Sequence, residues 1–150
     1  MKRLRCPRSP APCVALLSSG GVPRKDQPPF DIRKEEEGGP PVPAWLREQG
    51  FPDAGDWSIR LIDADTPSNM LAVIHGKYNT GPANEDINVI FPIDRIRELA
   101  ERALIGELAP HHIGMMGFIP DYTRVEDEVA PAVISRLKAD RVDALLLSPG

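Results

Sequence analysis

The three histidines of the chain, His75, His111 and His112, are the first candidates for proton transfer or anion binding. His75 directly follows an apolar run that ends at Ile74, so its imidazole is expected to emerge at the end of a strand. There it can act as a general acid or base, or bind a carboxylate. The competing interpretation is that His75 hydrogen-bonds the backbone and shapes a turn. His111 and His112 point to opposite faces of an extended strand, so at most one of them can share a site with His75.

A turn of serines and glycines, residues 18–21, is a second candidate site. It follows the apolar run 13–17, and its glycines let the backbone approach a ligand closely. The turn could bind a carboxylate or phosphate through its N–H groups. It lacks both the dinucleotide-binding and the P-loop glycine patterns, so a plain tight turn is an equal alternative. The candidate substrate-binding residues are Ser18, Ser19, His75, Asp86, Asn88 and His112.

No metal site is expected. His75, His112 and Asp86 have suitable chemistry, but their spacing fits no known ligand motif. Cys6 and Cys13 likewise match no metal or redox spacing. We expect these two residues to be a thiol in the terminal tail and a small apolar residue that opens a strand, without a disulfide framework.

The composition excludes several classes of protein. Hydrophobic residues at 41% and charged residues at 27% of 150 are typical of a soluble globular domain with a sizeable core. A formal net charge of −4 provides no basic field for nucleic acid or anionic lipid, so neither is an expected partner. The basic start resembles part of a signal peptide, but the apolar run 14–17 is too short to complete one. The chain is therefore expected to be cytoplasmic.

Prolines separate two regimes along the chain. Ten of the 17 prolines fall within residues 1–52, where regular ladders and long helices are disfavoured. We expect an irregular tail over residues 1–12, a first strand, and then a long proline- and glycine-rich excursion over residues 23–57. Alternation and apolar runs then predict a strand with an exposed face at 57–62 and a central strand at 70–74.

The second half of the sequence has an α/β pattern. Apolar residues at helical spacing predict one helix over residues 93–104, after Pro92, and a second helix that runs from Asp121 or Thr123 to Lys138. Pro131 must kink the second helix or begin a shorter one. The predicted strands of this half are residues 89–91, 112–118 and 142–147. The fold class is therefore α/β: one domain, with a largely parallel sheet and flanking helices.

The last predicted strand has no helix after it to cover the sheet, although parallel strands need both faces covered. We therefore expect a truncated domain that is incomplete at its carboxyl end. An uncovered apolar strand also predicts that the isolated chain is poorly soluble or prone to aggregation.

Several segments, in order, resemble the selenoprotein B family of glycine, sarcosine, betaine and D-proline reductases. The most specific are residues 86–95, followed at a fixed distance by residues 105–109. Residues 14–22, 27–31, 75–78 and 142–147 also match, so the resemblance covers most of the chain after Pro12. Residues 1–12 look unlike the family, which is consistent with a misassigned start codon.

The resemblance implies reductive cleavage of a carbon–nitrogen bond in a small amino acid or its N-methylated relative, with a dithiol or small thiol as electron donor. The family's nucleophile is a selenocysteine, which works as its anion because a selenol ionises near neutral pH. It comes just after the strand that here ends at Leu147, so it is expected after Gly150, where its UGA codon reads as a stop. This chain would then hold no catalytic residue and no cofactor, and a partner subunit would carry a pyruvoyl group. The alternative is a non-catalytic α/β domain that binds a small carboxylate or amino acid.

Overall fold

The computed structural model describes residues 11–150, which are organised around a four-stranded sheet. Its strands are β1 (Val14–Ser18), β2 (Ile59–Asp63), β3 (His111–Met115) and β4 (Ala144–Ser148), in the order β2-β3-β1-β4. β1 is parallel to β3 and β4, whereas β2 is antiparallel to β3. The predicted α/β class with a mostly parallel sheet is confirmed.

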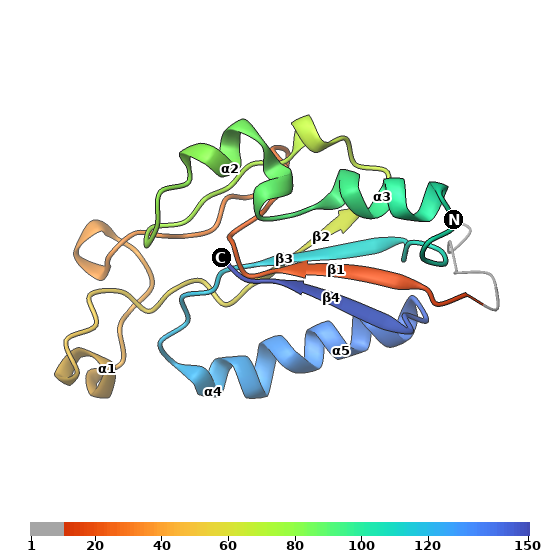
Figure 1. Ribbon diagram of the computed structural model, residues 1–150. Coiled ribbons are helices and arrows are strands. Elements are labelled where there is room, and N and C mark those ends of the chain that lie inside the picture. The colour runs from red at the N-terminus through yellow and green to blue at the C-terminus, as the bar shows by residue number, and fades with distance from the viewer. Residues whose placement is uncertain (1–10) are drawn as a thin grey trace.

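Helices lie on both faces of the sheet (Figure 1). One face carries α2 (Gly81–Glu85) and α3 (Ile93–Glu101), and the other carries α4 (Tyr122–Arg124) and α5 (Ala130–Ala139). Each interface has its own apolar cluster. The α3 side includes Leu16, Ile62, Phe91, Ile93 and Ile96, and the α5 side includes Leu17, Ile113, Val129 and Val133.

The predicted second helix forms as one run despite Pro131. Asp121 begins it, and its carboxylate accepts a hydrogen bond of 3.2 Å from the backbone N–H of Thr123. Pro131 lies in the first turn of α5, directly after a π-helical segment, Val125–Val129. A proline ring lacks an N–H and crowds the carbonyl four residues earlier, and the wider π turn accommodates it without breaking the helix.

Two predicted strands are wrong. Met70 ends a 3₁₀ turn and is 41% exposed, whereas Leu71 and Val73 are buried. Residues 70–74 pair with residues 21–25 through Ile74 N–H to Gly21 O at 2.8 Å and Lys25 N–H to Met70 O at 2.8 Å. They do not join the sheet, and Pro23 cannot donate to a longer ladder. Residues 89–91 continue from the 3₁₀ turn Ile87–Val89 toward α3.

Short elements occupy the long excursion between β1 and β2. They are the 3₁₀ turn Glu35–Glu37 and helix α1 (Ala44–Glu48); a further 3₁₀ turn, Ser68–Met70, follows β2. The excursion lies beyond the ends of the strands where residues 18 and 148 are found (Figure 1). It therefore borders the edge of the sheet at which parallel strands usually present ligand-binding groups.

Much of β4 is left uncovered by the rest of the fold. Leu145 packs into the α5-side cluster, but Leu146, which alternates to the opposite face, is 44% exposed, and Leu147 is 63% exposed. β4 is also an edge strand, bonded to β1 alone. The structure therefore leaves apolar surface and a free strand edge at β4.

Cys13 is buried in an apolar cluster directly before β1, as expected of a small apolar residue that opens a strand. It is also disulfide-bonded, which was not expected from the sequence. Cys6 and most of the predicted tail, residues 1–12, lie outside the described residues.

Candidate functional site

Three chain segments meet at the carboxyl ends of the parallel strands. Ser18 and Ser148 are partners in the sheet, so the residues after β4 run beside the turn after β1. The backbone N–H of Gly150 donates to Ser19 Oγ at 3.2 Å. A Cβ placed on Gly150 would lie 2.3 Å from Gly20 Cα, so the two glycines are packed against each other.

The N–H groups of the serine–glycine turn are already engaged. Ser19 donates to the Ser148 carbonyl at 3.2 Å, Gly20 to Ser18 Oγ at 3.0 Å, and Gly21 to the Met115 carbonyl at 2.9 Å. An anion would have to break these bonds to use the same donors. The turn therefore connects the ends of β1, β3 and β4 through these hydrogen bonds. An anion would have to bind to donors outside the turn.

His75 is connected to this turn through Tyr78. The two rings contact each other at a tilt of 41° with their centroids 4.6 Å apart, and the Tyr78 hydroxyl donates to the Gly20 carbonyl at 2.7 Å. His75 Nδ1 accepts the Lys77 backbone N–H at 3.1 Å, which leaves the proton of the neutral ring on Nε2. That Nε2 is buried and has no hydrogen-bond partner. Burial and, second, the charge of Lys77 lower the pKa of His75, so the imidazole is neutral at pH 7.

Asp86 caps the 3₁₀ turn Ile87–Val89, and Asn88 bonds to the first turn of α3. Asp86 Oδ1 accepts from the Asn88 backbone N–H at 3.0 Å, and Asn88 exchanges hydrogen bonds with the backbone and carboxylate of Asp94. The hydrogen bond from the Asn88 side chain lowers the pKa of Asp86. These polar groups satisfy one another, and Ile90 is the residue of this segment that touches the turn, because a Cβ on Gly20 would meet its side chain at 2.4 Å.

His112 lies inside the sheet. It is fully buried, opposite Ile62, and its Nδ1 accepts the backbone N–H of Leu16 at 3.1 Å. Desolvation, with smaller contributions from Arg97 and His111, lowers the pKa of His112 to about 4. His111 faces the other layer and contacts Asp140 at 2.8 Å, so the two histidines do point to opposite faces. Ser18, Ser19 and His75 thus converge at the carboxyl edge, whereas His112 lies near the start of β3, Asp86 caps a 3₁₀ turn and Asn88 bonds to α3. The roles of these residues in substrate binding stay predictions.

A cavity of about 110 Å³ adjoins this edge, and Met116, which bridges to Gly20, forms part of its wall. Lys77 Nζ lies 2.8 Å from Asp53 Oδ2 and 4.0 Å from the centre of the Phe118 ring, and all three residues line the cavity. Sequence reasoning did not single out Lys77, Asp53 or Phe118. The sequence signal that could have identified Lys77 as a site residue is its position two residues after His75. No nearby sequence feature links Asp53 to Lys77.

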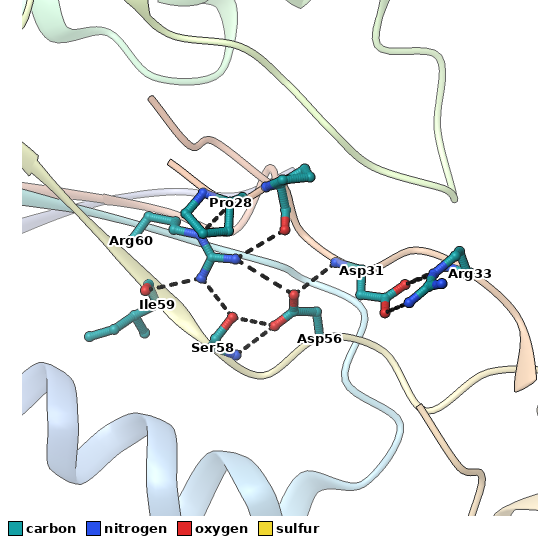
Figure 2. A network of polar contacts seen from close by, with 8 residues as sticks. Pro28, Asp31, Arg33, Asp56, Ser58, Ile59 and Arg60 are labelled. Atoms are coloured by element: carbon teal, nitrogen blue, oxygen red, sulfur yellow. Dashed lines mark hydrogen bonds and ion pairs between the residues drawn. The ribbon is translucent and has the colours of Figure 1, made fainter. Parts of the chain in front are cut away.

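The excursion forms another wall of the cavity, and Arg60 of β2 holds it in place. The Arg60 guanidinium donates to the Pro28 carbonyl at 3.0 Å and to the Pro29 carbonyl at 3.2 Å (Figure 2). It also stacks on the buried ring of Phe30 at 4.4 Å. Asp56, beside Arg60, accepts the backbone N–H of Asp31 at 2.8 Å (Figure 2). Since Asp31 lines the cavity, this network determines where that wall stands.

Neither a metal centre nor a membrane span is found in the described part of the chain. Residues 11–150 contain no group of three or more His, Cys, Asp or Glu residues arranged to hold a metal ion. Among the same residues, no helix has the length and hydropathy needed to cross a bilayer.

Comparison with known proteins identifies the family. The profile described as glycine/sarcosine/betaine reductase selenoprotein B matches residues 51–149, about two thirds of the chain. The chain belongs to this family. The resemblance inferred from the sequence segments is therefore confirmed.

Relatives within the selenoprotein B family are subunits of multi-subunit reductases. The chain is 43% identical to D-proline reductase subunit gamma of Acetoanaerobium sticklandii over 137 residues, which cover 91% of this chain and 48% of that protein. It is 28% identical to glycine reductase complex component B subunit gamma of Carboxydothermus hydrogenoformans, covering 90% of this chain and 27% of that protein. The chain thus spans less than half the length of these relatives. No solved structure gives a significant match.

Proposed function

We propose that this selenoprotein B chain is part of a cytoplasmic reductase that cleaves the C–N bond of glycine, sarcosine, betaine or D-proline. The chain would form the part of the active site that lies at the carboxyl ends of its parallel strands. In this reaction one C–N bond breaks, and two electrons and two protons come from a dithiol, which becomes a disulfide. The family match over residues 51–149 is the observation that carries the proposal. The 43% identity to a D-proline reductase subunit favours D-proline as the first substrate to test.

The position of residues 148–150 supports a nucleophile contributed by sequence that follows them. Gly150 is hydrogen-bonded to Ser19 and packed on Gly20, so a residue after it would emerge beside the turn and near Ile90. A selenocysteine there would supply a selenolate nucleophile at neutral pH. No side chain can be added at Gly20 without displacing Ile90, so the turn keeps this position narrow.

The chain's own residues would hold and orient the reactants. The Ser18–Gly21 turn holds the chain in place where it leaves β1. The hydrogen bond of the Tyr78 hydroxyl holds the segment that carries His75 against this turn. A neutral His75 has one N–H donor, on Nε2, that has no partner, but because this atom is buried it would reach a substrate only if the segment moved. A partner subunit would supply a pyruvoyl group, which would provide a carbonyl electrophile and an electron sink for those substrates that carry a primary or secondary amine.

The proposal is tested first on the coding DNA. A UGA codon after Gly150, with a selenocysteine insertion element and an in-frame continuation, is expected; a UAA or UAG codon there, without related coding sequence beyond it, contradicts it. The extended selenoprotein is then combined with its pyruvoyl partner, D-proline and a dithiol. We expect ring opening with one disulfide formed per substrate consumed, and loss of activity when serine replaces the selenocysteine.

Binding by the 150-residue chain separates this proposal from a non-catalytic carboxylate-binding domain. If the extended protein and its partner cleave none of the four substrates, while the chain still binds a small carboxylate tightly, the second function is favoured.

A further inference from the structure

We propose that Lys77 is the residue that receives the substrate's carboxylate, in the cavity it shares with Asp53 and Phe118. This inference rests on the proposed function, because it assumes that the substrate is a small amino acid. It adds a residue to the site that neither the serine–glycine turn nor the histidines supply.

The cavity has the size and lining for such a ligand. Its volume of about 110 Å³ holds several water molecules, well below the space that a drug-sized ligand needs. Ile32, Met116 and Phe118 provide apolar surface for a short carbon skeleton. The charged lining has both signs, as the two charges of an amino acid require: Lys34 and Lys77 are positive, and Asp31, Glu37 and Asp53 are negative. The cavity is also close to the proposed chemistry, since Met116 bridges to Gly20 and Gly20 touches Gly150.

A carboxylate needs donors that are free, and the turn offers none of its three engaged N–H groups. The Lys77 ammonium has three N–H donors and uses one of them on Asp53 at 2.8 Å. Arg33, near the same wall, is held in two hydrogen bonds by Asp31. The unused donors of Lys77 are therefore the best-placed ones for an anion in the cavity.

Lys77 is also held in place, which Lys34 is not. Asp53 is nearly buried, with 9% of its side chain exposed, and its other oxygen accepts the Gly55 backbone N–H at 3.2 Å. The face of Phe118 contacts the Lys77 ammonium from another side at 4.0 Å, a cation–π contact. Both lysines are exposed, Lys77 with 38% of its side chain, but among the described residues only Lys77 has this ion pair and this ring contact. An ammonium fixed in this way loses little side-chain entropy when it binds a ligand.

The experiment compares ligands with and without a carboxylate. Isothermal titration of the chain uses D-proline, glycine, betaine, and pyrrolidine, which keeps the ring of proline and lacks the carboxylate. We expect at least one amino acid to bind and pyrrolidine not to bind. Equal binding of pyrrolidine and D-proline, or no binding of any amino acid by the folded chain, overturns the proposal.

The variants locate the carboxylate. Lys77→Gln alone leaves Asp53 buried without its partner, so the test variant is the double substitution Lys77→Gln with Asp53→Asn, which removes both charges and keeps the acceptor for Gly55. Loss of a charge-assisted hydrogen bond should weaken binding about tenfold or more. Lys25→Gln, at an exposed lysine elsewhere, should bind as the parent does. Loss of binding in Lys34→Gln, with the double variant unaffected, also overturns the proposal.

The same variants are measured in the assembled reductase, which covers the case in which the isolated chain does not melt cooperatively. Loss of a carboxylate contact made equally before and during reaction raises KM about tenfold and leaves kcat nearly unchanged. An unchanged KM overturns the role of Lys77 even if the reaction itself proceeds, so failure here is distinct from failure of the proposed function.

Discussion

The hydroxyl of Tyr78 donates a 2.7 Å hydrogen bond to the carbonyl oxygen of Gly20, joining two segments that lie 58 residues apart. This bond attaches the His75 segment to the turn after β1. Burial raises the pKa of Tyr78, so the hydroxyl keeps its proton and remains a donor well above neutral pH.

Tyr78→Phe should destabilise the chain by about 1 kcal/mol, because the Gly20 carbonyl loses its donor while the ring still packs. Urea unfolding followed by circular dichroism measures the change. Tyr122→Phe is the matched control, since Tyr122 is 64% exposed and should change stability little. Equal losses in both variants would mean that the Gly20 contact contributes nothing.

Gly21→Ala should be more damaging than Gly50→Ala, although both glycines have a positive φ of +73° and +84° respectively. An alanine in this conformation costs about 1–2 kcal/mol at either site. At Gly21 the new Cβ would also lie 2.1 Å from the Ile74 carbonyl oxygen, whereas at Gly50 nothing lies within 4 Å. Thermal unfolding of the two variants gives the comparison, and a Gly50 variant that is the less stable of the two would contradict this account.

His112 should make stability depend on pH between about 6.5 and 4. Its pKa is 6.5 in the unfolded chain and about 4 in the folded chain, so the unfolded state binds more protons in this range. Its contribution is complete above pH 6.5 and is lost as the pH falls toward 4, by about 3 kcal/mol in total.

The matched variant for this prediction is His112→Asn, which retains an acceptor for the Leu16 N–H but does not titrate. Urea unfolding at a series of pH values should show a shallower loss of stability below pH 6.5 in the variant than in the parent. Parallel curves would show that His112 is not the group responsible.

Leu146→Glu should reduce self-association, so that the chain remains monomeric up to a higher protein concentration. Leu146 is 44% exposed on an edge strand, where a charge opposes strand-to-strand association. Light scattering after size exclusion measures the effect. Ile134→Glu, at a residue 49% exposed on α5 and away from that edge, should help less. A parent chain that is already monomeric at high concentration would remove the basis of the prediction.

Local sequence patterns predicted those structural features that depend only on residues close together in the sequence. The turn after β1 and the helix that follows Asp121 were both predictable, because glycines and capping residues act within a few positions. The burial of Leu71 and Val73 was also predictable from the apolar run that contains them. Their partner was not, since apolarity shows that a segment is buried and not what it pairs with.

The misassigned strand at 89–91 had a readable signal. Ile87, Ile90 and Phe91 are buried while Val89 is 66% exposed, and this spacing is helical. The site is a different case. Lys77 meets Asp53 across 24 residues, and His112 bonds to Leu16 across 96, so only the folded chain reveals either contact.

Arg60 holds the excursion by its main-chain oxygens at Pro28 and Pro29, not by their side chains. Hydrogen bonds to main-chain oxygens do not depend on which side chains those residues carry. If Phe30 is kept under the Arg60 guanidinium, the other loop residues that border the cavity can therefore be changed while the anchorage is retained. This makes them the natural place to engineer a different ligand preference without disturbing the sheet.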